Sequence, residues 1–292
     1  MVQSNSIGST IQMAFGIPSW IVGIFLVIIC GFIFMGGVDR LASVTEKLVP
    51  VMAAFFLIGG LGVLAMRLQY IPETFGLIFK YAFQPQAIIG GGFGIAIKTA
   101  VSQGAKRGLF SNEAGMGSTP HAHALALVKN PHEQGCVAMV GVFIDTFIVL
   151  TLNALVIIST LYAGNGPLAN GYVGEAANTL KNTNLAQVAF GVVYGDKAGA
   201  VFVAICLFFF AFSTILGWNL FAKINVTYLF GKKAQRPFML VALVFIFLGT
   251  IGESDLVWAC SDMFNQLMVI PNAIALFALT GVVTKMLGDR DK

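Results

Sequence analysis

The residues of this chain that could do chemistry are polar side chains that interrupt long apolar stretches. The most marked case is Gly90–Pro120 (GGGFGIAIKTAVSQGAKRGLFSNEAGMGSTP), where glycines and charged residues occur together. Glycine destabilises a regular helix by about 1 kcal/mol relative to alanine, and a broken helix frees carbonyls for a cation and N–H groups for a carboxylate. The pattern therefore favours a binding segment. A close helix crossing followed by an ordinary loop is the alternative.

A second candidate site lies in the stretch FFFAFSTILGWNLFAKIN, which contains Ser213, Thr214 and Trp218. Thr214 and Trp218 are four residues apart and share a helix face. Hydroxyl oxygens suit a small hard cation, and an indole ring would supply an apolar wall. The alternative is that both hydroxyls bond to their own helix and the tryptophan anchors at the interface. The sequence alone leaves both interpretations open.

Asp145 and the three histidines are weaker candidates for functional residues. Asp145 is flanked by apolar residues, and we favour an ion pair with Lys106 or Arg107 over a proton or cation relay. His121 and His123 are two apart, on different helix faces, and no cysteine or carboxylate cluster joins them or His132. We therefore expect no metal site.

The amino-acid composition limits the class of protein to which this chain can belong. Of the 292 residues, 57% are hydrophobic and only 10% are charged, against roughly 25% charged in soluble domains. The mean hydropathy is +0.85. These values exclude a soluble enzyme, a disulfide scaffold and a disordered chain. No hydrolase, zinc-protease or nucleotide-binding motif is present, so we expect neither an enzyme nor a nucleic-acid-binding protein.

Apolar stretches of about 20 residues predict an all-α polytopic membrane protein. We expect a single membrane domain over residues 1–292, with seven spans: 18–38, 48–67, 87–103 (continuing to 128), 136–162, 199–222, 237–251 and 266–287. Helical spacing also predicts surface helices at Ile71–Phe83 and Leu185–Val193.

The loop charges predict an orientation. Ten cations fall on one side of the predicted spans and four on the other. The positive-inside rule places the first side, with the C-terminus, in the cytoplasm.

The run Gly104–Ala124 (GAKRGLFSNEAGMGSTPHAHA) closely resembles the signature of the alanine/glycine:cation symporter family, the sodium:alanine symporters. Val38–Pro50, Gly141–Thr146, Phe210–Trp218 and Gln3–Ser6 are also similar to family segments. The resemblance implies a LeuT-like bundle with inverted repeats in the cell membrane. It also implies sodium-coupled uptake of a small neutral amino acid, alanine or glycine, by alternating access. No cofactor is implied beyond the coupling sodium ion.

The resemblance also suggests site residues. Ser213 and Thr214 fall where LeuT-like folds place sodium ligands, and Thr214 with Trp218 matches the family's pocket-lining pair. Gln103, Gly104 and Asn112 are further expected substrate contacts.

Family members are longer and begin with more spans, so this chain resembles the C-terminal portion of a symporter. One alternative is therefore a truncated, non-transporting membrane fragment, and another is a chain whose missing spans another chain supplies. A channel-like or lipid-binding membrane protein is a third possibility.

Overall fold

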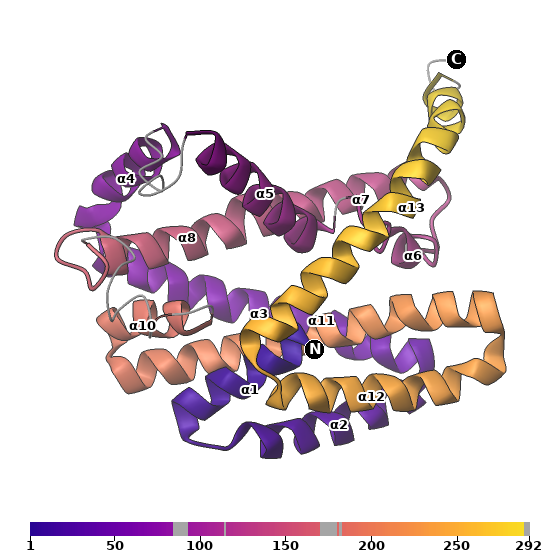
Figure 1. Ribbon diagram of the computed structural model, residues 1–292, viewed down its shortest axis with the longest axis horizontal. Helices are drawn as coiled ribbons and strands as arrows, with labels where there is room; N and C mark the ends of the chain where they lie inside the picture. Colours follow the sequence, from indigo (N-terminus) through magenta and orange to yellow (C-terminus); the bar gives the residue numbers. More distant parts are fainter. Residues whose placement is uncertain (84–92, 114, 170–179, 181–182, 289–292) are drawn as a thin grey trace. The chain divides into compact units, whose positions relative to one another are not determined.

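The computed structural model describes residues 1–83, 93–113, 115–169, 180 and 183–288 (Figure 1). These residues form helices and connecting turns, and no β-strand occurs among them. The α-helices are α1 (Val2–Phe15), α2 (Ser19–Met35), α3 (Gly37–Met66), α4 (Ile71–Phe83), α5 (Phe93–Asn112), α6 (Pro120–His123), α7 (Pro131–Phe143), α8 (Thr151–Ile157), α10 (Thr183–Tyr194), α11 (Asp196–Phe230), α12 (Gln235–Ile251) and α13 (Ser254–Gly288).

Short helical segments of other types complete the description. Two π-helical segments, η3 (Ile144–Leu150) and η4 (Ile158–Tyr162), continue α7 and α8 without a break, and Asp145 lies in η3. Two 3₁₀ turns, η1 (Leu68–Tyr70) and η5 (Lys232–Ala234), precede α4 and α12.

The chain divides into two compact units. Unit 1 comprises residues 1–87 and 138–257, and unit 2 comprises residues 88–137 and 258–292. Unit 1 therefore holds α1 to α4, α8 and α10 to α12, whereas unit 2 holds α5, α6 and most of α13.

The core of unit 1 lies where α1 packs against α2, α11 and α12. Ile7 of α1, Leu26 and Cys30 of α2, and Leu216 of α11 are fully buried in one apolar cluster. Figure 1 shows α2 and α12 running side by side below α11, and these two helices pack on each other. The Asn5 side chain also joins α1 to α12 by hydrogen bonds, because its Nδ2 donates to the Gly249 and Gly252 carbonyls at the end of α12.

A second cluster of unit 1 joins α3, α8, α10 and α11 around the fully buried Phe190. Small residues allow the helices to approach closely. A Cβ added to Gly199 of α11 would overlap the backbone of Gly191 in α10. Gly59 of α3 lies against the ring of Phe202, and its carbonyl accepts a 2.8 Å hydrogen bond from Tyr194.

Polar contacts fix the ends of α3 and α4. The Arg67 guanidinium donates twice to the Ser159 carbonyl, at 2.6 and 3.1 Å, and lies over the ring of Tyr70. The Glu73 carboxylate of α4 accepts from the Gly164 amide at 3.0 Å. These contacts hold the turns at one end of unit 1 to one another.

The helices of this chain expose apolar side chains. Ile58 of α3 and Phe277 of α13 are 73% and 82% exposed. Such faces are unfavourable in water and typical of lipid contact. Five described helical stretches are long and apolar enough to cross a membrane: Arg40–Met66, Pro131–Tyr162, Asp196–Phe230, Lys232–Ile251 and Ser254–Lys285.

The predicted spans map onto these helices with differences at the ends. The predicted span 18–38 corresponds to α2, which at 17 residues is a shorter apolar helix. The predicted span 87–103 begins outside the described residues, and α5 continues nine residues beyond it to Asn112. The single membrane domain over residues 1–292 stays a prediction.

Candidate functional site

The hydroxyl pair of α11 lies in the middle of a continuous 35-residue helix. Ser213 and Thr214 both donate to the Phe210 carbonyl, each at 2.9 Å, and both are half-buried. The Ser213 Oγ also lies 3.7 Å from the Met52 sulfur of α3. The hydroxyls therefore bond to their own helix, as one of the two interpretations predicted.

This bonding leaves the cation interpretation open. A hydroxyl has one hydrogen to donate and two lone pairs that accept. The hydrogen bond to Phe210 uses only the hydrogen, so the lone pairs of Ser213 and Thr214 keep their capacity to coordinate a cation.

Trp218 lies one turn after Thr214 on the same helix. It is half-buried, and its ring packs edge-on against Phe221 with the ring centroids 5.8 Å apart. This contact restricts the indole and gives the Thr214 face a bulky apolar neighbour. The geometry is compatible with a wall that limits the size of a ligand.

The other predicted substrate residues lie on α5. Gln103 and Gly104 are exposed and belong to an unbroken stretch of α-helix from Phe93 to Asn112. The described chain first leaves the helix after Asn112, at Glu113, which has a positive φ of 51°. The break therefore follows the substrate candidates Gln103 and Gly104. The glycines at 90–92 lie outside the described residues.

The segment after α5 forms a tightly bonded turn. The Glu113 carboxylate accepts from the hydroxyls of Ser118, at 2.8 Å, and Thr119, at 3.1 Å. Gly115 and Gly117 have φ angles of 92° and 75°, a region that glycine adopts without strain. The glycines and the acid of the FSNEAGMGS motif thus have a structural explanation.

The same turn docks on α13. The Asn272 side chain donates from Nδ2 to the Gly115 carbonyl at 2.9 Å, and its amide group lies against Gly117. Nearer the start of α13, Arg107 and Asp262 form an ion pair at 3.5 Å, and the Arg107 guanidinium lies over the Trp258 ring. Asp262 and Trp258 could not be predicted as site residues from the sequence, because nothing local links positions 107 and 262.

The predicted site residues thus fall into two sets. Ser213, Thr214 and Trp218 come together in unit 1, whereas Gln103, Gly104 and Asn112 lie on one helix of unit 2. Each set is thus held within its own unit.

The histidines have separate local contacts. His121 Nδ1 lies 2.8 Å from the Ser118 carbonyl, and His123 Nδ1 lies 2.7 Å from the Gln134 amide. Within the described residues, no three His, Cys, Asp or Glu side chains lie close enough to hold a metal ion.

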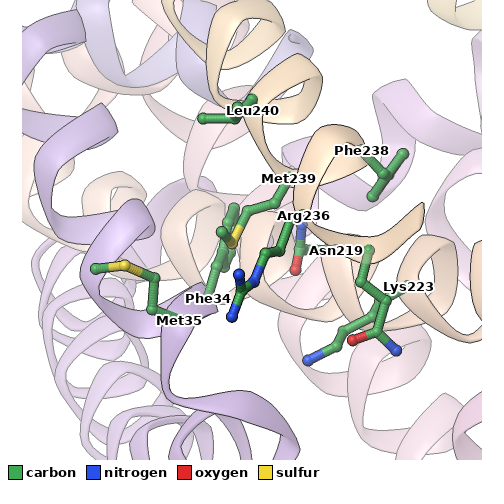
Figure 2. Close-up of a pocket in the computed structure, with 9 residues that line it drawn as sticks. Phe34, Met35, Asn219, Lys223, Arg236, Phe238, Met239 and Leu240 are labelled. Carbon is green, nitrogen blue, oxygen red and sulfur yellow. The ribbon is translucent and has the colours of Figure 1, made fainter. Parts of the chain in front are cut away.

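A cavity of about 520 Å³ lies between α2, α11 and α12 in unit 1 (Figure 2). Figure 2 shows Lys223 and Arg236 at this pocket together with Phe34 and Met239. Asn219 also lines it, but none of the predicted substrate or sodium residues does. The pocket thus combines apolar walls with two cations, Lys223 of α11 and Arg236 of α12.

Comparison with known proteins decides the family. The sequence pattern of the sodium:alanine symporter family matches residues 1–292, the whole chain. The chain belongs to the sodium:alanine symporter family. It is thus related to membrane transporters rather than to enzymes, in agreement with the resemblance of the Gly104–Ala124 run.

Relatives of known name have related transport substrates. The chain is 38% identical to the sodium/alanine symporter AgcS of Methanococcus maripaludis over 97% of its own length. It is 37% identical to a sodium/proton-dependent alanine carrier protein of a Bacillus species over 95% of its length. A probable sodium/glutamine symporter of Bacillus subtilis is 33% identical over 99%.

These alignments cover only part of each relative. The chain spans 59% of the Methanococcus symporter, 63% of the Bacillus alanine carrier and 57% of the probable glutamine symporter.

Proposed function

We propose that this protein carries out sodium-coupled symport of a small neutral amino acid, alanine or glycine, across the cell membrane. Family membership over the entire chain is the observation that carries this proposal. The relatives named for sodium and alanine support the ion and the substrate class. The apolar helices support a location in a membrane.

The proposed site uses both sets of candidate residues. Ser213 and Thr214 contribute oxygen ligands to the sodium ion, and the bulk of Trp218 limits the substrate side chain. Gln103, Gly104 and Asn112 contact the substrate from α5. A sodium ion near the substrate carboxylate lowers the cost of placing that charge within the membrane.

We further propose a LeuT-like arrangement that works by alternating access, with one helix group rocking against the other. The division into two compact units is compatible with two such groups, because each has its own internal contacts.

Thermodynamic linkage provides a direct test of coupling. If bound sodium favours alanine binding, alanine must tighten sodium binding by the same factor. Binding of labelled alanine to the purified chain is measured in sodium and in potassium at equal ionic strength. We expect binding at least about fivefold tighter in sodium. Equal affinity in both salts contradicts the proposal.

A further inference from the structure

The contact between α5 and α13 is more extensive than a single ion pair. Arg107 contributes a charge contact to Asp262 and places its guanidinium 4.7 Å from the centre of the Trp258 ring. The ring of Phe110 lies 5.3 Å from the same tryptophan. These groups form a small cluster that combines a charge pair with aromatic packing.

The cluster occupies one face of each helix. Gln103, Arg107 and Phe110 follow the i, i+4, i+7 spacing of a single face of α5, and Trp258 and Asp262 are four residues apart on α13. Gln103, a proposed substrate contact, is thus one turn from Arg107 on the same face. A contact that fixes Arg107 on α13 therefore also restricts how this face of α5, with Gln103, can rotate.

A second contact lies 10 residues further along α13 from Asp262. There Asn272 donates to the Gly115 carbonyl and packs against Gly117 of the turn that follows α5. At 1.5 Å rise per residue, the two contacts are about 15 Å apart along α13. Two well-separated contacts resist rotation of one helix on the other, whereas a single contact allows it.

We propose that Arg107 and Asp262 are positioning residues for transport: they fix α5 on α13, hold Gln103 in place, and make the two helices move as one body. This inference rests on the proposed function, since the role of Gln103 does. Both helices belong to the same compact unit, which supports their movement together. The charge pair suits this role because Asp262 lies in a helix long and apolar enough to cross a membrane, where an unpaired carboxylate is costly.

Charge exchange tests the pair. Arg107→Asp and Asp262→Arg each place two like charges together, and each is expected to lower sodium-driven alanine uptake by about tenfold or more. The double exchange restores opposite charges, so uptake is expected to recover to within about threefold of the original protein. Recovery stays incomplete because the guanidinium leaves the Trp258 ring. Lys106→Asp and Asp255→Arg, on the same two helices, are the matched controls.

A stability measurement keeps the test decisive if a single variant folds poorly. The thermal unfolding midpoint in lipid nanodiscs is expected to fall in both single variants and to rise again in the double exchange. Failure of the double exchange to regain stability and uptake overturns the pairing. If the unaltered protein shows no sodium-driven uptake, the proposed function fails, while the stability data still decide whether the pair exists.

Cross-linking tests the single-body claim and separates a positioning pair from a gate. Arg107→Cys and Asp262→Cys are combined in a variant whose four native cysteines are replaced by serine. A short, cleavable bifunctional thiol reagent then links the two helices in vesicles. We expect equal linking with and without sodium and alanine, and we expect uptake, lowered by the loss of the charge pair, to rise when the link fixes α5 on α13 again. If linking abolishes uptake and cleavage restores it, the helices must separate during transport and the inference is wrong.

Discussion

Thr214 shows how a residue can satisfy its helix and still serve a ligand. Its hydrogen goes to the Phe210 carbonyl, and its lone pairs remain for a cation. Thr280 of α13 makes the same bond, at 2.9 Å to the Leu276 carbonyl, but lies on an exposed face. Two threonines with the same local bonding thus differ only in their surroundings, so they form a matched pair for experiment.

We predict that Thr214→Val raises the sodium concentration for half-maximal uptake by about tenfold. Valine keeps the shape but removes one oxygen ligand, which costs on the order of 1–2 kcal/mol. Uptake is measured against a sodium series. Thr280→Val is expected to leave the sodium dependence unchanged. An unchanged curve for Thr214→Val removes this residue from the sodium site.

We predict that Trp218 limits the size of the substrate side chain. Replacing the indole with alanine removes the bulk that packs on Phe221, so Trp218→Ala is expected to admit leucine and phenylalanine or to abolish binding. Competition of alanine, leucine and phenylalanine for labelled alanine uptake measures this. Trp20→Ala, at a half-exposed tryptophan of α2, is the control. Unaltered discrimination by the Trp218 variant would count against the assignment.

At the scale of elements, local sequence predicted much that the structure contains. α4 covers the predicted Ile71–Phe83, and α10 includes the predicted Leu185–Val193. Apolar periodicity and span length depend on neighbouring residues and are visible in the sequence. Contacts such as Arg107 with Asp262 join positions 155 residues apart, and no local pattern encodes them. The sequence analysis gave Asp145 a partner in Lys106 or Arg107, and that pairing stays a prediction, whereas the ion pair of Arg107 with Asp262 had no local signal.

The close crossing of α10 and α11 leads to a stability prediction. Gly199→Ala is expected to destabilise the protein by about 1–3 kcal/mol, because the new methyl group meets the Gly191 backbone, which cannot turn aside. Thermal unfolding in nanodiscs measures the effect. Gly217→Ala on the same helix meets no atom within 4 Å and serves as the control. Equal thermal unfolding midpoints for the two variants would contradict the close approach of Gly199 to Gly191.

For the whole molecule, the site candidates are distributed over two units. The sequence indicated which residue types to examine, and family resemblance indicated their roles. Local patterns do not encode how Ser213 of α11 and Gln103 of α5 would serve one ligand, because that depends on contacts between residues far apart in the sequence.

The orientation of the molecule is a prediction of its own. The cation bias places the C-terminus in the cytoplasm. In the cysteine-free background, Lys285→Cys is expected to resist a membrane-impermeant maleimide in intact cells and to react after permeabilisation. Lys80→Cys, predicted outside, is expected to react in intact cells. The reverse labelling pattern would invert the topology.

Sodium-driven uptake of labelled alanine is the most direct test of the central claim. The purified chain is reconstituted into vesicles, and an inward sodium gradient is compared with an equal potassium gradient. The account predicts accumulation above equilibrium in sodium alone, which collapses when an ionophore dissipates the gradient. Alanine entry that is equal in both salts, or no entry by a protein shown to be correctly inserted, would contradict symport by this chain.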